Sequence, residues 1–276
     1  MPAEDDITID EKRVYEKTRR ETTLYIASEL GIARVAVSGD QVGRFSLVER
    51  CQATSIAASP DHVVAGTDEA VLVHTGDEFE STGFGPAAAV GVDEGRVLAA
   101  SPAGRVARYD DGWETVGEVT EPRRFDGSLL AGADGVYRVG SALENLGLDS
   151  VRDVAGLGPA DSLAATGSGL YRHHDTECHL EAEQPMTAVV ADGSRGYAVA
   201  DGGLLEAELK DDSRTSTQRS VPDGPLADLA AAESLYAVTD DGTVLVAADP
   251  ASTPDGQGGW RTRALGVRGV VELTMR

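Results

Sequence analysis

The sequence contains only two cysteines, Cys51 and Cys178, and they lie far apart in the chain. Two isolated cysteines cannot build a disulfide framework, and they fit a reducing compartment. No run of about 18 apolar residues occurs, so we expect no membrane-spanning helix. The first residues, MPAEDDITIDEKRVYEK, are rich in acids and lack an apolar h-region, so we expect no signal peptide. These absences predict a cytoplasmic protein without a membrane partner.

Positive charge is also scarce, because 24 Lys and Arg face 47 Asp and Glu, which gives a formal net charge of −23. Only Lys12, Lys17 and Lys210 are lysines. Self-repulsion of this size acts over about 30 Å at 0.01 M salt but over only about 3 Å at 1 M. We therefore expect a halophilic protein from a salt-loaded cytoplasm. The alternative is an acidic protein that binds cations or basic partners. Nucleic acid is not an expected partner, because no basic stripe offsets the repulsion.

Helical periodicity is almost absent, and a repeat takes its place. LLAGADGVYRV, residues 129–139, is followed 34 residues later by LAATGSGLYRH, residues 163–173. Each segment has two short apolar runs around a tight turn. Seven such segments recur about every 35 residues, with turn residues Gly31, Glu69, Gly104, Gly135, Gly169, Gly203 and Gly242. Glycine at six of these seven turns suits a hairpin that needs positive φ.

Each repeat contains two further segments that have the pattern of strands. An apolar run such as TSIAAS or TAVVAD precedes the hairpin, and a weaker segment such as WETVGE or CHLEAE follows it. Four short strands per unit are typical of a propeller blade. The sequence therefore predicts an all-β protein, a seven-bladed β-propeller of four-stranded antiparallel blades over residues 22–276. Residues 1–21 are expected to form an N-terminal arm.

The first repeat lacks the upstream run, and the end of the chain supplies one in VRGVVELTMR, residues 267–276. We therefore expect the C-terminal strand to close the first blade, with Val270 to Thr274 paired with Leu24 to Ser28. Closure of this kind removes free sheet edges from the ring.

The segment ARYDDGWETV, with Asp110, Gly112 and Trp113, resembles a degenerate repeat of Asp-box or neuraminidase-like propellers. The full S-x-D-x-G-x-T-W box does not occur. The whole acidic chain, with ITIDEKRVY near its start, resembles a haloarchaeal family of propeller proteins that has no assigned function. That resemblance implies a fold and no particular activity.

Arginines mark the start of several predicted inner strands. When these strands are aligned on their first apolar residue, Arg123, Arg152 and Arg268 fall two places before it, and Arg124 follows Arg123. A guanidinium cluster at one mouth of the channel would suit a carboxylate or a phosphate. The alternative is that these arginines form salt bridges with nearby acids such as Asp153, Glu121 and Glu272.

The segment RHHDTECH, residues 172–179, holds three of the five histidines. If Asp175 and Thr176 form the turn, His174 faces Glu177, and His179 lies on the same side. Two imidazoles and a carboxylate could bind Zn²⁺ or another divalent ion. The alternative is a solvated polar turn. Cys178 is expected to fill a core position, because it aligns with Trp113.

No catalytic residue is predicted, because no G-x-S-x-G, Walker, H-E-x-x-H or C-x-x-C motif occurs. No cofactor is expected. Two function classes remain. The first is a monomeric, non-catalytic platform that binds a protein partner through one propeller face. The second is an anion binder, or a hydrolase of small molecules or glycans, at the channel mouth around the arginines.

Overall fold

The structure, a computed structural model, describes residues 21–76, 78–158, 160–174, 177–193, 195–200, 203–209, 216–222, 224–248 and 259–276. The predicted arm of residues 1–21 lies outside this range except for Glu21, which begins the first strand. The described residues form strands and connections without a helix. None of them belongs to a helix that could cross a membrane.

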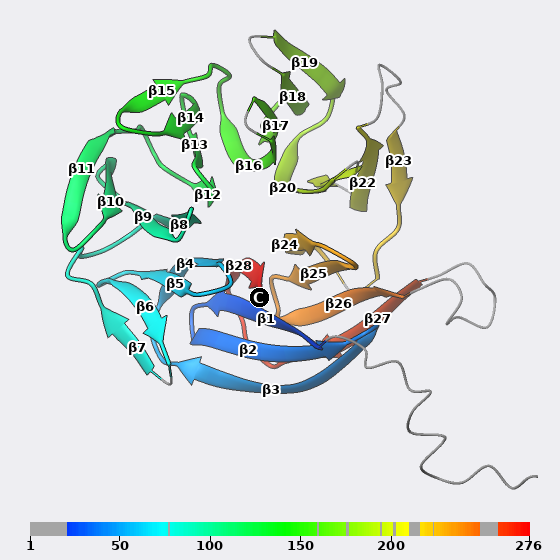
Figure 1. Ribbon diagram of the computed structural model, residues 1–276. Helices are drawn as coiled ribbons and strands as arrows, with labels where there is room; N and C mark the ends of the chain where they lie inside the picture. The colour runs from blue at the N-terminus through cyan, green and yellow to red at the C-terminus, as the bar shows by residue number, and fades with distance from the viewer. Residues whose placement is uncertain are drawn as a thin grey trace, which may run out of the picture.

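In the described part of the chain, twenty-eight strands form seven antiparallel four-stranded sheets, arranged as blades around a central axis (Figure 1). The inner strands are β28 (Val270–Met275), β4 (Ala53–Ala58), β8 (Ala89–Asp93), β12 (Arg124–Asp126), β16 (Val151–Gly158), β20 (Met186–Asp192) and β24 (Leu226–Ala231), in blades 1 to 7. The second strands are β1 (Glu21–Ser28), β5 (Val63–Thr67), β9 (Arg96–Ala100), β13 (Leu129–Gly132), β17 (Asp161–Thr166), β21 (Arg195–Ala200) and β25 (Leu235–Thr239).

The two outer layers follow in the same blade order. The third strands are β2 (Gly31–Ser38), β6 (Val71–Thr75), β10 (Arg105–Tyr109), β14 (Gly135–Val139), β18 (Leu170–His174), β22 (Gly203–Glu208) and β26 (Thr243–Ala248). The outermost strands are β3 (Gln41–Glu49), β7 (Glu78–Ser81), β11 (Trp113–Glu118), β15 (Leu143–Asn145), β19 (Glu177–Ala182), β23 (Ser216–Arg219) and β27 (Gly259–Ala264). The seven-bladed, four-stranded architecture predicted from the repeat is therefore confirmed.

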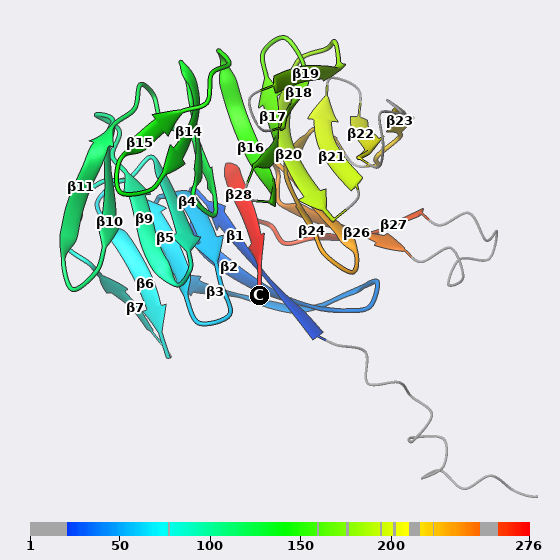
Figure 2. The same cartoon turned by 45° about the horizontal axis from the view of Figure 1, so that its top comes forward.

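The chain closes through its last strand, as predicted. β28 lies at the centre beside β1 in both views (Figures 1 and 2) and pairs with it from Ser28 opposite Val270 to Leu24 opposite Met275. Blade 1 is thus built from both ends of the repeat region. Because the last blade is held to the first by a hydrogen-bonded strand, the ring has no open junction.

The hydrophobic core lies between the blades. The described residues form seven clusters of buried apolar side chains, one at each junction of neighbouring blades. At the junction of blades 7 and 1, for example, Tyr236 and Val238 of β25 pack with Leu24 of β1 and Leu273 of β28. Each blade alternates its apolar residues between two junctions, as the period of two in its strands requires.

Glycine is needed at the repeated turn position for a second reason in addition to positive φ. Gly31 has a φ of 128°, as predicted, but the φ of Gly169 is not positive. A Cβ at Gly31 would lie 2.0 Å from the carbonyl oxygen of Glu49, and one at Gly169 would lie 2.6 Å from that of Ala182. In both blades the end of the outermost strand approaches the hairpin so closely that only glycine fits.

Candidate functional site at the central channel

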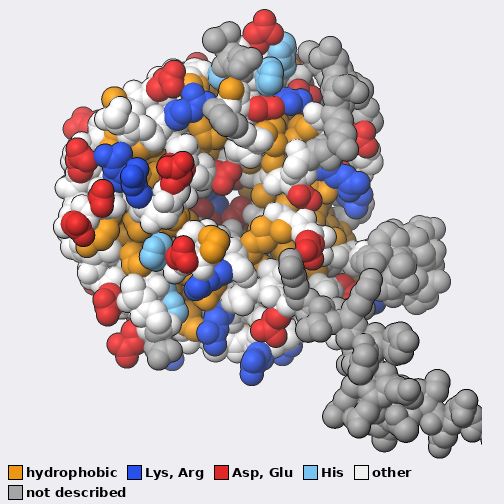
Figure 3. All heavy atoms as spheres, viewed as in Figure 1, with side chains coloured by type: hydrophobic (Ala, Val, Ile, Leu, Met, Phe, Trp, Pro, Cys, Tyr) orange, Lys and Arg blue, Asp and Glu red, His pale blue; other side chains and the backbone are white. Residues whose placement is uncertain are grey.

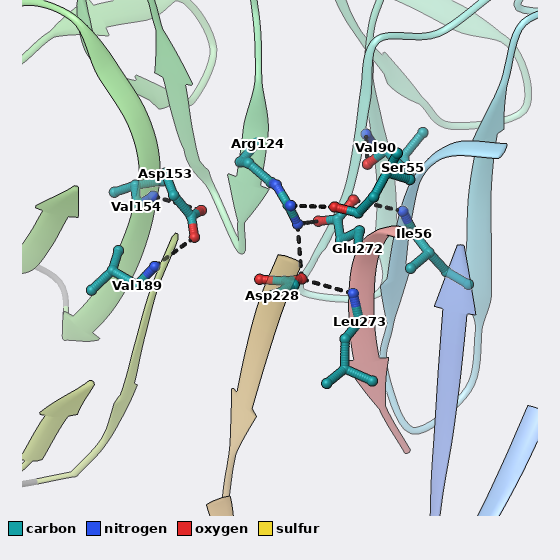
Figure 4. Close-up of polar contacts among 11 residues, drawn as sticks. Ser55, Ile56, Val90, Arg124, Asp153, Val154, Val189, Asp228, Glu272 and Leu273 are labelled. Carbon is teal, nitrogen blue, oxygen red and sulfur yellow. Dashed lines mark hydrogen bonds and ion pairs between the residues drawn. The ribbon is translucent and has the colours of Figure 1, made fainter. Parts of the chain in front are cut away.

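A ring of polar side chains lines the channel at one position of the inner strands, directly before a buried apolar residue. Four of these side chains accept a hydrogen bond from a backbone N–H of the next blade (Figure 4). The acceptor-to-donor pairs are Glu272 to Ile56 (2.8 Å), Ser55 to Val90 (3.0 Å), Asp153 to Val189 (2.8 Å) and Asp228 to Leu273 (2.7 Å). These bonds satisfy buried inner-strand donors and join successive blades.

Arg124 holds the same position on β12 of blade 4, where the ring has a donor instead of an acceptor. Its guanidinium crosses the channel to the opposite blades. It pairs with Asp228 of blade 7 at 2.9 Å and Glu272 of blade 1 at 3.1 Å, and it donates to the carbonyl of Val271 (Figure 4). The exposed fractions of these side chains are 17% for Arg124, 6% for Asp228 and 8% for Glu272. A buried, charge-assisted bridge thus spans the channel.

The carboxyl groups of this ring have displaced pKa values. Burial raises the pKa of Asp153 to about 7, and the charge of Asp228 acts in the same direction, while Arg124 opposes it. Burial also raises the pKa of Glu272. Burial lowers the pKa of Arg124, but the three surrounding carboxylates outweigh it, so the pKa of Arg124 is raised and the side chain stays charged. With three acids against one arginine, the ring carries excess negative charge when ionised.

A cavity of about 300 Å³ lies above this ring and is lined by inner-strand residues of all seven blades. Small apolar side chains such as Ala58, Ala155 and Ala191 line its walls together with the charged members of the ring. Figure 3 shows the hollow at the centre of the molecule, with acidic side chains at its bottom. Of the four arginines predicted to bind an anion, only Arg124 lines the cavity, and it lies among carboxylates.

Arg123 and Arg152 lie at blade junctions. Arg123 donates to the carbonyl of Val151 at 2.8 Å and pairs with Glu121 at 3.2 Å. Arg152 donates to the carbonyl of Met186 at 3.2 Å. In each case the carbonyl belongs to the following blade and lies three residues before its aligned apolar residue. The predicted register of these two arginines is therefore found in the structure, and their guanidinium groups connect neighbouring blades.

The predicted register of Arg268 is wrong. The N–H of Leu273 donates to Asp228, as the N–H of Ile56 donates to Glu272. Leu273, rather than Val270, is therefore the residue of β28 equivalent to Ile56. The apolar pair Val270–Val271 misled the alignment by three residues. Arg268 consequently precedes the strand and is exposed. Binding of an anion by Arg123, Arg124, Arg152 and Arg268 stays a prediction.

The histidine segment forms part of blade 5 at its outer strands. His174 lies opposite Glu177 in the β18–β19 pair, as predicted, and the turn residues 175 and 176 lie outside the described part of the chain. His179 contacts Glu177 at 3.2 Å, whereas Nδ1 of His174 contacts Asp161 at 3.5 Å. Within the described ranges, no group of three His, Cys, Asp or Glu side chains is placed to hold a metal ion. Zn²⁺ binding by His174, Glu177 and His179 stays a prediction.

Cys178 does not fill a core position, which corrects the expectation from its alignment with Trp113. It is exposed on β19, opposite His173 of β18. β19 is the outermost strand of its sheet, as β11 is, but Trp113 of β11 packs against a buried cluster, whereas Cys178 is exposed.

Ser55 and Asp228 were not predicted as functional residues, and Glu272 was expected only as an acid that pairs with an arginine, which it does with Arg124. The signal was present, because a polar residue directly precedes the apolar residue in S-I, R-F, D-V, D-L and E-L. Attention to the position two places earlier selected Arg123 and Arg152 instead. The function of the polar position became visible only when the next blade supplied its partner.

Comparison with known proteins identifies one family. A family model described as "HVO_0234-like, beta propeller" matches residues 8–276. A search of curated proteins gives no match.

Solved structures share the fold at low sequence identity. A protein from Lactobacillus plantarum is 14% identical with a TM-score of 0.69, and the match covers 93% of this chain and 100% of that one. A functionally unknown protein from Desulfotomaculum acetoxidans is 11% identical with a TM-score of 0.67, over 93% and 99% of the two chains. YCF48, in a structure with D1 peptide, is 13% identical with a TM-score of 0.57, over 78% and 81%. At this identity the likeness concerns the fold alone.

Proposed function

The chain belongs to the HVO_0234-like beta-propeller family, and we propose that it is a non-catalytic platform that binds a protein partner through one propeller face. The polar ring of the channel is the observation that carries this proposal. Asp228 and Glu272 each accept a backbone N–H and pair with Arg124. Carboxylates that are engaged with the protein itself stabilise the scaffold. A rigid scaffold can present its loops and rims to a partner.

Two further features support a binding role. Arg123 and Arg152 donate hydrogen bonds to carbonyls of the next blade, so their guanidinium groups hold neighbouring blades together. YCF48, which shares the fold, is bound to D1 peptide in its structure, which gives a precedent for peptide binding by a propeller of this shape.

We place this platform in the salt-loaded cytoplasm of a haloarchaeon, as a monomer without a cofactor. The excess of 47 acids over 24 bases supports this setting, because molar salt reduces the range of self-repulsion to about 3 Å.

The test is affinity capture with the full chain as bait at about 2 M KCl, where surface charges are screened. Carboxylate-reactive cross-linkers are suitable, since the chain has 47 acids. We expect a partner that is retained in stoichiometric amount, with cross-links confined to one face of the ring.

The alternative function, an anion binder or a hydrolase at the channel mouth, is tested in parallel with phosphate esters and aryl glycosides. Turnover by the wild-type chain that Arg124→Gln abolishes would overturn the platform proposal. Cross-links scattered over both faces, or no retained partner, would also contradict it.

A further inference from the structure

We propose that the outer edge of blade 1 is the docking surface for an extended acidic segment of a partner protein. The inference rests on the proposed function and names the surface and the kind of partner. The surface, which we call the rim patch, consists of Arg44, Phe45 and Leu47 on β3 together with Arg263 on β27.

The rim patch has an apolar strip. Among the described residues, the large hydrophobic side chains that are exposed are Leu30, Phe45 and Leu47, with Phe45 at 39% and Leu47 at 37%. Phe45 and Leu47 lie two residues apart, so they point to the same side of β3. Their cross-strand neighbours on β2, Val35 and Ala33, belong to the buried cluster between blades 7 and 1. The strip therefore continues that core outward, beyond the part that blade 7 covers.

The rim patch is also cationic, unlike most of the rim. The outermost strands β7, β11, β15 and β19 carry acids and neither Lys nor Arg; their acids are Glu78, Glu80, Glu114, Glu118, Glu144, Glu177 and Glu181. By contrast, β3 contains one arginine, Arg44, in addition to one acid, Glu49, and β27 contains Arg261 and Arg263. Arg261 pairs with Asp40 at 3.4 Å. Figure 3 shows Lys and Arg side chains along the lower rim, where Figure 1 places β3.

Arg263 fixes the geometry of this rim. It donates to the carbonyls of Val42 and Gly43 at 3.0 and 2.6 Å, and its guanidinium lies 5.3 Å from the ring centre of Phe45. A cation is thereby held beside an aromatic ring at the start of β3. β3 is the terminal strand of its sheet, and residues 45–47, which pair regularly with β2 between two register shifts, offer a strand edge beyond the capped carbonyls. An extended peptide can add to such an edge as a further strand.

The charge of the rim patch selects the occupant. A strand with acids alternating with apolar residues would place its apolar side chains on the face of Phe45 and Leu47, and its carboxylates on the opposite face, toward Arg44. A second copy of the chain would bring the same arginines together, which is unfavourable. Nucleic acid would be repelled by the net charge of −23. Screening at high salt leaves only close contacts, so the local positive charge decides the interaction.

The first experiment uses a fluorescein-labelled peptide of about nine residues in which Asp or Glu alternates with Val. A scrambled peptide of the same composition and a fluorescein-labelled oligo(U) are the comparison ligands. Each is titrated with the full chain at about 1 M KCl while anisotropy is measured. We expect saturable binding of the alternating peptide only. Equal binding of both peptides, or preferred binding of oligo(U), would overturn the proposal.

Matched variants then locate the site. Arg44→Glu should weaken binding of the alternating peptide by about tenfold, and Phe45→Ser should weaken it several-fold. Arg96→Glu on β9 makes the same change in net charge at another exposed arginine and should leave binding unchanged. Thermal melting establishes that each variant is folded. Equal weakening by Arg44→Glu and Arg96→Glu would show a general charge effect and refute the rim patch.

The two proposals can fail separately. If a captured partner is retained equally by the wild type and by Arg44→Glu, the rim patch is refuted while the platform stands. If the alternating peptide binds but no partner is retained, the platform proposal is contradicted, while the rim patch is still supported as a site for acidic peptides.

Discussion

Replacement of Arg124 by leucine should destabilise the whole ring. The substitution leaves Asp228 and Glu272 buried without their cation, at exposed fractions of 6% and 8%. Removal of one partner from a buried ion pair costs about 3–5 kcal/mol. An unfolding entropy of about 2.1 cal/mol/K per residue gives about 0.6 kcal/mol/K for 276 residues. The expected decrease in Tm is therefore about 5–9 °C.

The assay is thermal and urea unfolding followed by circular dichroism at about 1 M KCl. The control is Arg138→Leu, which removes an exposed pair with Glu144 at 3.2 Å and should cost less than about 1 kcal/mol. The loss in Arg124→Leu should become smaller as the pH falls, because burial raises the pKa of Glu272 and protonation of Glu272 removes one of the charges left without a cation.

A rescue separates charge from hydrogen bonding. The triple variant Arg124→Leu, Asp228→Asn and Glu272→Gln removes all three charges and keeps oxygen acceptors for the N–H groups of Leu273 and Ile56. It should recover most of the stability lost in Arg124→Leu. Equal stability of Arg124→Leu and Arg138→Leu, or no recovery in the triple variant, would refute the assignment of a buried bridge across the channel.

Four other predictions follow from the fold. Because the pKa of Asp153 is raised to about 7, the charged form of Asp153 is disfavoured in the folded state. The contribution of Asp153 to the free energy of unfolding should therefore fall as pH rises from about 4 to 7. Asp153→Asn should reduce this dependence of the free energy of unfolding on pH. Tm should rise between about 0.1 and 1 M KCl, and an unchanged Tm would contradict the role of self-repulsion. Gly169→Ala should cost about 1–3 kcal/mol, because its Cβ would lie 2.6 Å from a carbonyl, whereas Gly112→Ala has nothing within 4 Å and should be neutral. Leu273→Ala, in the closing strand at 5% exposure, should cost about 2–5 kcal/mol, and a cost under 1 would argue against closure by β28.

The repeat made the fold predictable. Strand alternation and the spacing of turn glycines are local properties, so the blades and even the pairing of β28 with β1 could be derived from them. The structural reason why a given position needs a particular residue was harder to infer. Gly169 was expected for a positive φ, but it is needed because the carbonyl of Ala182, thirteen residues away, approaches its Cα.

The candidate site was less predictable than the fold. Arg123 and Arg152 were placed in register correctly, because an alignment of repeats compares equivalent positions. Arg268 was not, since β28 has no hairpin after it to fix its register. Arg124 was included, and Glu272 was among the acids expected to pair with these arginines, which the structure confirms. Asp228, which lies 104 residues further along the chain, was not named as a partner.

The sequence by itself determined the composition, the strands, the number of blades and the order in which they close, because these depend on periodic patterns within about 35 residues. Only the tertiary structure decided which charges meet. Three blades bring Arg124, Asp228 and Glu272 together in the channel, and two blades form the rim patch. The physical reason is that contacts across a ring depend on how its blades are arranged in space, whereas the blades themselves depend on the local chain.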